Sequence, residues 1–178
     1  QTFLMDINIL NEAQLSQLDQ LIASAETILI TCHKSPDGDA IGSCLGWAEY
    51  LRTREKEAIV IVPDQYPDFL QWLPNSEKIV RYDKHPEKCD MLFKIADLVF
   101  CLDFNATSRV QDMEATHVSS PAPKVLIDHH LDPDVPAVLT ISQPEACSTC
   151  ELVFRIVWQL GGFDRLDKRF AVPVYCGM

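Results

Sequence analysis

The chain has 178 residues, of which 47% are hydrophobic, and its 26 acidic and 15 basic side chains give a formal net charge of −11. This length fits one domain with a packed core. The acidic balance disfavours binding to duplex DNA, which needs many Lys and Arg contacts to phosphate. No stretch reaches the roughly 18 consecutive apolar residues of a membrane helix. Residues 1–10 carry no secretory signal pattern, so we expect a cytoplasmic protein.

Short apolar runs predict buried strands, and apolar residues at helical spacing predict helices between most of them. The predicted strands are residues 27–32, 58–62, 97–102, 124–127 and 137–141. The predicted helices are residues 11–25, 40–54 and 149–160, with a further one beginning after residue 164 in which Pro173 argues against a long regular helix. Strands that are apolar throughout and alternate with helices predict an α/β fold, mainly a parallel sheet with helices on both faces.

The turn after the first strand, "HKSPDGDAIGS", places His33, Asp37 and Asp39 close enough for one loop to present them together. Gly38 permits a left-handed backbone between the two carboxylates. Asp39 is the predicted N-cap of a helix that begins at Ala40. The alternative interpretation of this segment is a capped turn with solvated aspartates.

Two further strands are followed by candidate ligands. Asp103 comes directly after the strand that ends at residue 102, and the triplet Asp128-His129-His130 follows the strand that ends at residue 127. Ligands of parallel α/β sheets bind at the carboxyl ends of the strands, so we expect all these side chains to converge there. An exposed turn is the alternative for the triplet, and a simple strand end for Asp103.

Imidazole and carboxylate ligands together suit manganese, iron or zinc better than calcium. Several shared aspartates indicate two ions rather than one. Two ions roughly 3.5–4 Å apart can clamp the attacking and leaving oxygens of a phosphoryl displacement and activate a water molecule. The sequence therefore predicts a two-metal centre.

Cysteine usage gives no second metal site. Cys147 and Cys150 form a lone C-x-x-C without the two further ligands of a structural zinc site. Ser148 and Glu151 instead predict a capping box at the start of a helix. The remaining cysteines have apolar neighbours and are expected to be buried: Cys32, Cys44, Cys89, Cys101 and Cys176.

The cluster around His33, the strand-end Asp103, the Asp128-His129-His130 triplet and the helix start "CSTCELVF" resemble, in order and spacing, the DHH phosphoesterase family. The resemblance covers essentially the whole chain, residues 1–178. It implies the parallel-sheet catalytic domain of that family, with a centre of two divalent metal ions that is usually manganese.

The resemblance also implies roles for single residues. His33 and Asp37 would bind one ion, Asp39 and His129 the other, and Asp103 would bridge both. The remaining implied roles are His130 facing the substrate phosphate as a proton donor or electrophilic contact, Asp128 orienting the imidazole next to it, and Arg109 contacting phosphate. An exposed surface arginine is the alternative for Arg109.

The run Pro36-Asp37-Gly38-Asp39-Ala40 resembles the oligoribonuclease and 3′-phosphoadenosine-5′-phosphate phosphatase branch of the family. The implied substrates are short RNA oligonucleotides or nucleoside bisphosphates. Alternatives are a manganese pyrophosphatase, a cyclic-dinucleotide phosphodiesterase, and a non-catalytic metal- or nucleotide-binding module. A Rossmann nucleotide-binding domain would need a G-x-G-x-x-G after the first strand, which this sequence lacks. The oligomeric state stays open, a homodimer included.

The sequence departs from the family pattern at one point. It lacks the family's fourth motif, an aspartate in a Thr-Asp-Thr-Gly context, and the C-terminal substrate-binding domain. We therefore expect most of a catalytic domain, incomplete at its C-terminal side, with weak or no activity from these 178 residues alone.

Overall fold

The computed structural model describes residues 6–178, so the first half of the segment inspected for a signal peptide lies outside the described residues. Six strands form one sheet in the order β3-β2-β1-β4-β5-β6, and every neighbouring pair is parallel. The strands are β1 (Thr27–Thr31), β2 (Glu57–Val62), β3 (Val80–Arg81), β4 (Leu98–Leu102), β5 (Lys124–Asp128) and β6 (Leu139–Ser142). The α/β prediction is confirmed, and the strand order reverses between β1 and β4.

Two differences from the predicted strands have simple causes. Strand β3 was not predicted, because its two residues are too short for an alternating or apolar pattern to register. Strand β6 begins at Leu139 rather than at residue 137, and its register with β5 runs from Leu139 to Ser142.

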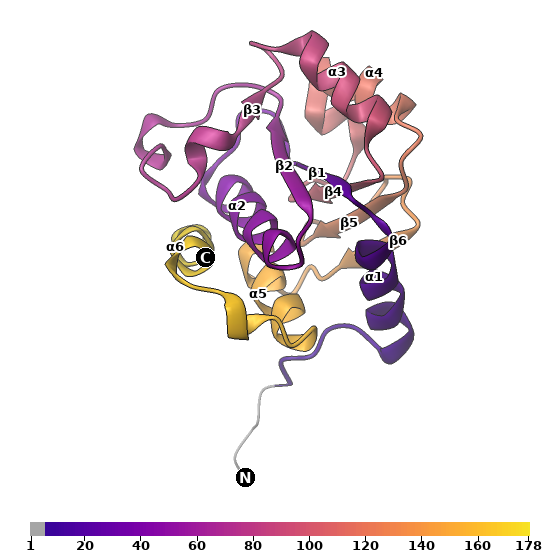
Figure 1. Cartoon of the computed structure of the whole chain (residues 1–178), viewed down its shortest axis with the longest axis vertical. Helices are drawn as coiled ribbons and strands as arrows, with labels where there is room; N and C mark the ends of the chain where they lie inside the picture. Colours follow the sequence, from indigo (N-terminus) through magenta and orange to yellow (C-terminus); the bar gives the residue numbers. More distant parts are fainter. Residues whose placement is uncertain (1–5) are drawn as a thin grey trace.

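Helices cover both faces of the sheet (Figure 1), as predicted. The face that holds the larger apolar cluster is covered by α1 (Glu12–Ser24), α2 (Gly38–Thr53), α5 (Thr149–Gln159) and α6 (Lys168–Gly177). The opposite face is covered by α3 (Pro86–Ile95) and α4 (Glu114–Ser119) with the 3-10 helix η3 (Thr107–Met113). Shorter 3-10 turns are η1 (Asp68–Leu70), η2 (Ser76–Lys78) and η4 (Phe163–Arg165).

Each central strand contributes to both cores because successive side chains point to opposite faces. In β1, Ile28 and Ile30 belong to the larger cluster, while Leu29 between them belongs to the cluster under α3 and α4. A strand that is buried on both faces must be apolar at every position, which is why these strands read as continuous apolar runs.

Helix α6 lies directly against α2. A Cβ added to Gly42 would collide with the carbonyl oxygen of Pro173, and one added to Gly46 would collide with Val174. The absence of a side chain at Gly42 thus allows α6 to approach the backbone of α2 closely. Helix α6 continues through Pro173 to Gly177 although a proline removes one backbone donor, because its contacts with α2 offset that loss.

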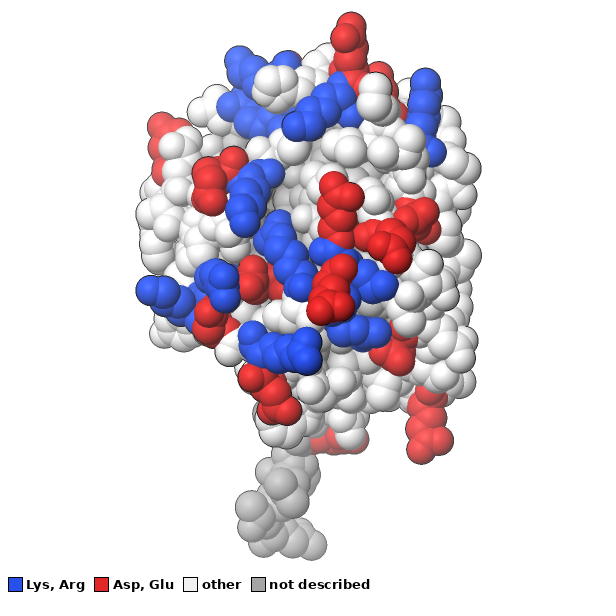
Figure 2. Space-filling view, viewed as in Figure 1, with Lys and Arg blue, Asp and Glu red and all other residues white. Residues whose placement is uncertain are grey.

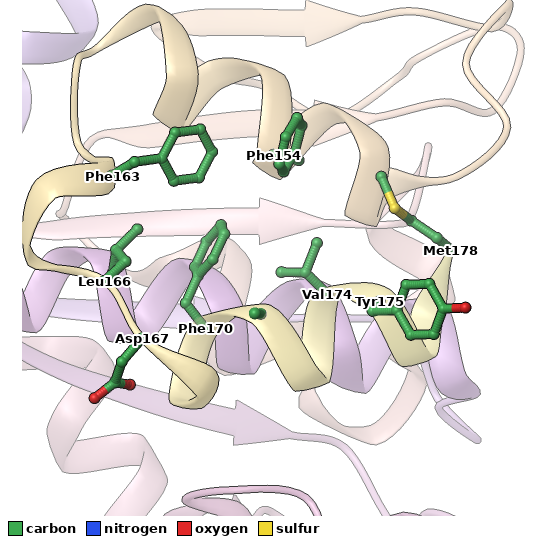
Figure 3. Close-up of a pocket in the computed structure, with 9 residues that line it drawn as sticks. Phe154, Phe163, Leu166, Asp167, Phe170, Val174, Tyr175 and Met178 are labelled. Atoms are coloured by element: carbon green, nitrogen blue, oxygen red, sulfur yellow. The ribbon is translucent and has the colours of Figure 1, made fainter.

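The apolar space between α5 and α6 forms a cavity of about 530 Å³. Figure 3 shows Phe154 and Phe163 on one side of it and Phe170 and Val174 on the other. Asp167 is the one acidic residue in its lining, and none of the predicted metal ligands belongs to it. This cavity is thus separate from the predicted site.

Four of the five cysteines expected to be buried are buried, and Cys176 is exposed near the end of α6. Cys147 is exposed and Cys150 is buried, so the two thiols of the C-x-x-C lie in different environments. Ser148 caps α5 as predicted by accepting a hydrogen bond from the amide of Glu151. The reciprocal bond differs, since the Glu151 carboxylate accepts from the amide of Cys147 instead of Ser148.

On the face drawn in Figure 2, basic and acidic side chains are intermixed rather than gathered into one basic surface. None of the helices within residues 6–178 has both the length and the hydropathy needed to cross a bilayer.

Candidate metal centre

The loop between β1 and α2 presents the first group of predicted ligands. Asp37 is the N-cap of α2, and its Oδ1 accepts a hydrogen bond of 2.9 Å from the amide of Ala40. The prediction that Asp39 caps this helix is therefore wrong, because the helix begins two residues earlier than predicted, at Gly38. Gly38 is also not left-handed; the loop reverses at Ser35, whose φ is +54°. A helical Gly38 lets both Asp37 and Asp39 point to the same edge of the sheet.

His33 leads the loop and is 9% exposed. Its Nδ1 donates to the carbonyl oxygen of Lys34 at 2.7 Å, which leaves Nε2 as the atom that faces the site. That Nε2 lies 3.5 Å from Oδ2 of Asp103 and 3.8 Å from Oδ1 of Asp37. In neutral imidazole this tautomer offers the Nε2 lone pair to a metal ion.

The charges around His33 change its protonation strongly. Burial alone would lower the pKa of His33, but hydrogen bonds to Asp103 and Asp37 outweigh it and raise the pKa to about 11. The hydrogen bond from His33 in turn lowers the pKa of Asp37 to about 2. The imidazole of His33 is therefore protonated between the two carboxylates. A divalent cation bound there would have to displace this proton.

Asp103 lies at the centre of the site. It follows β4 with a left-handed φ of +64°, a conformation that aspartate tolerates better than most residues. Its amide donates to the carbonyl oxygen of Ile127 at 3.1 Å, which continues the pairing of β4 with β5 and holds this backbone in place. The side chain is nearly buried, and its Oδ1 accepts a hydrogen bond of 3.0 Å from the hydroxyl of Thr149.

The triplet after β5 supplies the second group. Nε2 of His129 lies 3.4 Å from Oδ1 of Asp103 and 3.5 Å from Oδ2 of Asp39. His130 donates from Nδ1 to Oδ1 of Asp128 at 2.6 Å. Asp128 thus holds the imidazole two residues on, rather than that of His129 next to it as expected. Asp128 is fully buried as the last residue of β5.

Asp39 joins the site to the start of α5. Its two carboxylate oxygens accept hydrogen bonds from the amides of Thr149 at 2.9 Å and Cys150 at 2.8 Å. Burial and the neighbouring charge of Asp103 raise the pKa of Asp39 to about 6, although the two amides act in the opposite direction. Two carboxylates that repel each other in a partly buried site are stabilised by a bound cation.

The converging atoms form two groups whose members all lie within 4.8 Å of one another. One group is His33, Asp37 and Asp103, and the other is Asp103, His129 and His130. Asp39 borders the second group through His129. The structure therefore brings the predicted metal ligands together at one edge of the sheet, beside the point where the strand order reverses.

The donor set fits divalent metal ions. It combines imidazole nitrogens with carboxylate oxygens, and neither group includes a cysteine. Oδ2 of Asp128 is buried and lacks a hydrogen-bond partner within residues 6–178, so this wall of the site has unused acceptor capacity.

Arg109 and Thr149 complete the surroundings. Arg109 is exposed on η3, and its carbonyl oxygen accepts a hydrogen bond of 2.8 Å from the amide of Lys34, which places η3 beside the ligand loop. Sequence reasoning missed Thr149, which contacts both Asp39 and Asp103. A threonine in the first turn after a serine N-cap has an ordinary local explanation, so the sequence offered no signal for this role.

A parallel α/β sheet that gathers two histidine–aspartate groups at its carboxyl edge defines a class of domain with a candidate two-metal centre. The family model described as "DHH family, N-terminal domain" matches residues 27–178. The chain belongs to the DHH family, as the sequence motifs indicated.

Two curated relatives are similar to this chain. The bifunctional oligoribonuclease and PAP phosphatase NrnA of Thermus thermophilus is 32% identical over 151 residues, which are 85% of this chain and 42% of the relative. The cyclic-di-AMP phosphodiesterase GdpP of Geobacillus thermodenitrificans is 27% identical over 152 residues, which are 79% of this chain and 22% of the relative. The chain thus spans less than half the length of either relative.

Solved structures agree on the fold. An exopolyphosphatase-related protein from Bacteroides fragilis is 43% identical and superposes with a TM-score of 0.94, covering 96% of this chain and 50% of that one. RecJ from Thermus thermophilus in complex with Mn²⁺ is 14% identical with a TM-score of 0.53, covering 94% of this chain and 24% of that one, and is similar in fold alone.

Proposed function

We propose that this chain is the metal-binding catalytic domain of a phosphoesterase that hydrolyses short oligoribonucleotides, nucleoside 3′,5′-bisphosphates or both. The observation that carries the proposal is the position of Asp103. Its Oδ2 lies 3.5 Å from Nε2 of His33, and its Oδ1 lies 3.4 Å from Nε2 of His129. One carboxylate with an oxygen directed to each group is suited to bridging two ions.

Each proposed ligand keeps the role that the family resemblance implies. His33 and Asp37 would hold one divalent ion, Asp39 and His129 would hold the other, and Asp103 would contact both. When bound, such a pair of ions would supply Lewis-acid stabilisation of a phosphoryl oxygen and an activated water. Manganese is the proposed metal because the ligands mix imidazole and carboxylate, and because the RecJ structure of similar fold is a complex with Mn²⁺.

His130 and Asp128 act on the substrate side. Asp128 accepts from Nδ1 of His130 at 2.6 Å, so the other ring nitrogen, Nε2, is left to face the phosphate. A buried carboxylate that accepts from one ring nitrogen fixes the orientation of the imidazole. We assign His130 to the contact with a phosphate oxygen or with the leaving oxygen, and Asp128 to holding it in place.

The choice of substrate follows from charge and from similarity. A chain of net charge −11 with intermixed surface charges suits a short ligand better than duplex DNA. The similarity to NrnA supports oligoribonucleotides and 3′-phosphoadenosine-5′-phosphate. Exposed Arg109 beside the ligand loop is the proposed phosphate contact.

Hydrolysis of a cyclic dinucleotide is a second candidate. It is favoured by the similarity to GdpP, a cyclic-di-AMP phosphodiesterase. The same two-ion centre would serve, because the scissile bond is a phosphodiester, as it is in an oligoribonucleotide. The two candidates differ in what must fit around the phosphate rather than in the chemistry at the metal ions.

A substrate panel tests the proposal. Two- to five-nucleotide RNA, 3′-phosphoadenosine-5′-phosphate, cyclic di-AMP and pyrophosphate are incubated with Mn²⁺ and the protein, both as these 178 residues and as the complete reading frame that encodes them. We expect turnover of RNA or of the bisphosphate that EDTA abolishes. Turnover of cyclic di-AMP alone would select the second candidate, and turnover of pyrophosphate alone would contradict both.

Calorimetry with Mn²⁺ separates an enzyme from a non-catalytic binding module. The proposal expects two bound ions together with hydrolysis by the complete reading frame. Two bound ions without hydrolysis of any panel member would favour the binding module. Absence of Mn²⁺ binding would refute the metal centre itself.

A further inference from the structure

The loop that carries His33 and Asp37 turns at Ser35, which has a left-handed φ of +54°. A serine rarely adopts this conformation without surrounding contacts that hold it. The contacts matter because His33 lies two residues before this turn and Asp37 two residues after it. Whatever fixes Ser35 therefore fixes the relative position of two proposed metal ligands.

Asp64 makes that contact from the neighbouring strand. It follows β2 by two residues, and β2 pairs with β1 so that Ile61 lies opposite Thr31. Oδ1 of Asp64 accepts a hydrogen bond of 2.6 Å from the amide of Ser35, and Oδ2 accepts one of 3.4 Å from the Ser35 hydroxyl. Both oxygens of a half-buried carboxylate are thus directed to one residue of the ligand loop.

The amide of Ser35 and the carbonyl of Lys34 are the two ends of one planar peptide group. Asp64 accepts from the N–H end, and the C=O end accepts from Nδ1 of His33 at 2.7 Å. The three groups form a chain of hydrogen bonds from carboxylate to peptide to imidazole. Hydrogen bonds linked in this way polarise one another, so the hydrogen bond that Asp64 accepts strengthens the carbonyl as an acceptor for the His33 ring.

We propose that Asp64 is a positioning residue for the metal centre. It orients the Lys34–Ser35 peptide so that its carbonyl fixes the His33 ring, with Nε2 directed to Asp37 and Asp103. Histidine ligands commonly donate their second ring N–H to a carboxylate or a backbone carbonyl. Here a carboxylate acts through the backbone carbonyl. The inference rests on the proposed function, because it assigns His33 to a metal ion.

The test compares Mn²⁺ affinity, measured by calorimetry, in the wild type, Asp64→Ala and Asp64→Asn. We expect Asp64→Ala to weaken binding by about tenfold, which is at the lower end of the effect of removing an outer partner of a metal ligand. Asp64→Asn keeps an oxygen that accepts from the Ser35 amide, so it should recover most of the affinity. Recovery by asparagine, which has no charge, would show that the accepting oxygen rather than the charge of Asp64 is what the loop requires.

Two further variants serve as controls. Asp68→Ala removes an exposed carboxylate from the same connection, where it only accepts from the side chain of Gln71 at 3.1 Å, and should leave affinity unchanged. Ser35→Gly removes the hydroxyl but keeps the amide and suits the left-handed turn, so it should bind Mn²⁺ within about threefold of the wild type. Thermal unfolding in EDTA checks that every variant is folded.

Wild-type affinity in Asp64→Ala would overturn the inference and leave the proposed function intact. Equal losses in Asp64→Ala and Asp64→Asn would overturn it as well, because the amide contact would then be irrelevant, and so would a tenfold loss in Ser35→Gly. A wild-type protein that binds no Mn²⁺ would instead refute the proposed function, and with it this inference.

Discussion

Two buried histidines in this molecule have opposite surroundings. His33 lies at the carboxyl edge of the sheet between carboxylates, and its pKa is raised to about 11. His117 lies in the apolar cluster under α3 and α4, edge-on to the rings of Phe93 and Phe104, with Nε2 3.2 Å from Sγ of Cys101. Burial lowers the pKa of His117 to about 4. Burial alone makes an imidazole a neutral core side chain, and only the neighbouring carboxylates make one a candidate ligand.

The largest expected effect is a loss of activity when Asp103, at the same edge of the sheet as His33, is changed. Asp103→Asn keeps the shape of the side chain but removes the charge shared by both ligand groups. We expect Mn²⁺-dependent hydrolysis to fall by more than about 100-fold, since mutation of even an outer partner of a metal ligand lowers metal affinity or activity by 10–100-fold. Steady-state rates on the best substrate of the panel measure it. The matched change Asp112→Asn, on an exposed carboxylate, should have no effect; unchanged turnover in Asp103→Asn would refute the bridging assignment.

Removal of the His117 imidazole, on the face of the sheet covered by α3 and α4, should lower the stability of the fold rather than the activity. His117→Ala leaves a cavity between Phe93 and Phe104 and exposes no ligand group, so we expect the free energy of unfolding to fall by about 2–4 kcal/mol. Urea unfolding measures this loss. Mn²⁺ affinity of the folded variant should equal that of the wild type, and a reduced affinity would mean that the two regions are coupled.

The lowered pKa of His117 predicts a pH dependence of stability. The unfolded chain binds a proton at pKa 6.5 and the folded protein only at about 4, so the stabilisation is complete above pH 6.5 and is lost as the pH falls toward 4. Lowering the pH from 7 to 5 should reduce the contribution of His117 to the free energy of unfolding by about 2 kcal/mol. Urea unfolding in EDTA at both pH values, in wild type and His117→Leu, isolates it. Equal pH dependence in the two proteins would contradict the assignment.

A smaller effect is expected where the site meets α5. Thr149→Val removes the hydroxyl that donates to Asp103 but keeps the volume and the amide that donates to Asp39. Mn²⁺ affinity measured by calorimetry should fall by about tenfold. Thr140→Val is a matched control, because Thr140 is exposed on β6. A change confined to thermal stability would give Thr149 a packing role only.

The smallest expected effect is at the rim. Arg109→Ala should raise the KM for a phosphorylated substrate severalfold, since an exposed charge pair is worth about 1 kcal/mol or less. Mn²⁺ affinity should not change, because the backbone carbonyl that contacts the ligand loop remains. An unchanged KM would mean that Arg109 is an ordinary surface residue without a contact to the substrate.

The sequence predicted those parts of the site that follow from strand ends. Asp103 and the Asp128–His130 triplet come directly after apolar runs, and a parallel sheet brings such residues to one edge. Asp64 also follows a strand, but nothing in its neighbourhood distinguished it from a solvated turn. Its contact with Ser35 depends on the register between β1 and β2, which cannot be predicted from a short stretch of sequence. Thr149 was missed for the same reason, because its partners lie 46 and 110 residues away in the chain.

The reversal of strand order between β1 and β4 divides the chain into two halves that meet along one seam. His33, Asp37 and Asp39 belong to the first half, while Asp103 and His129 belong to the second. The group formed by His33, Asp37 and Asp103 takes its members from both halves. A cation bound there would hold the two halves of the sheet together. Metal binding would therefore raise the free energy of unfolding.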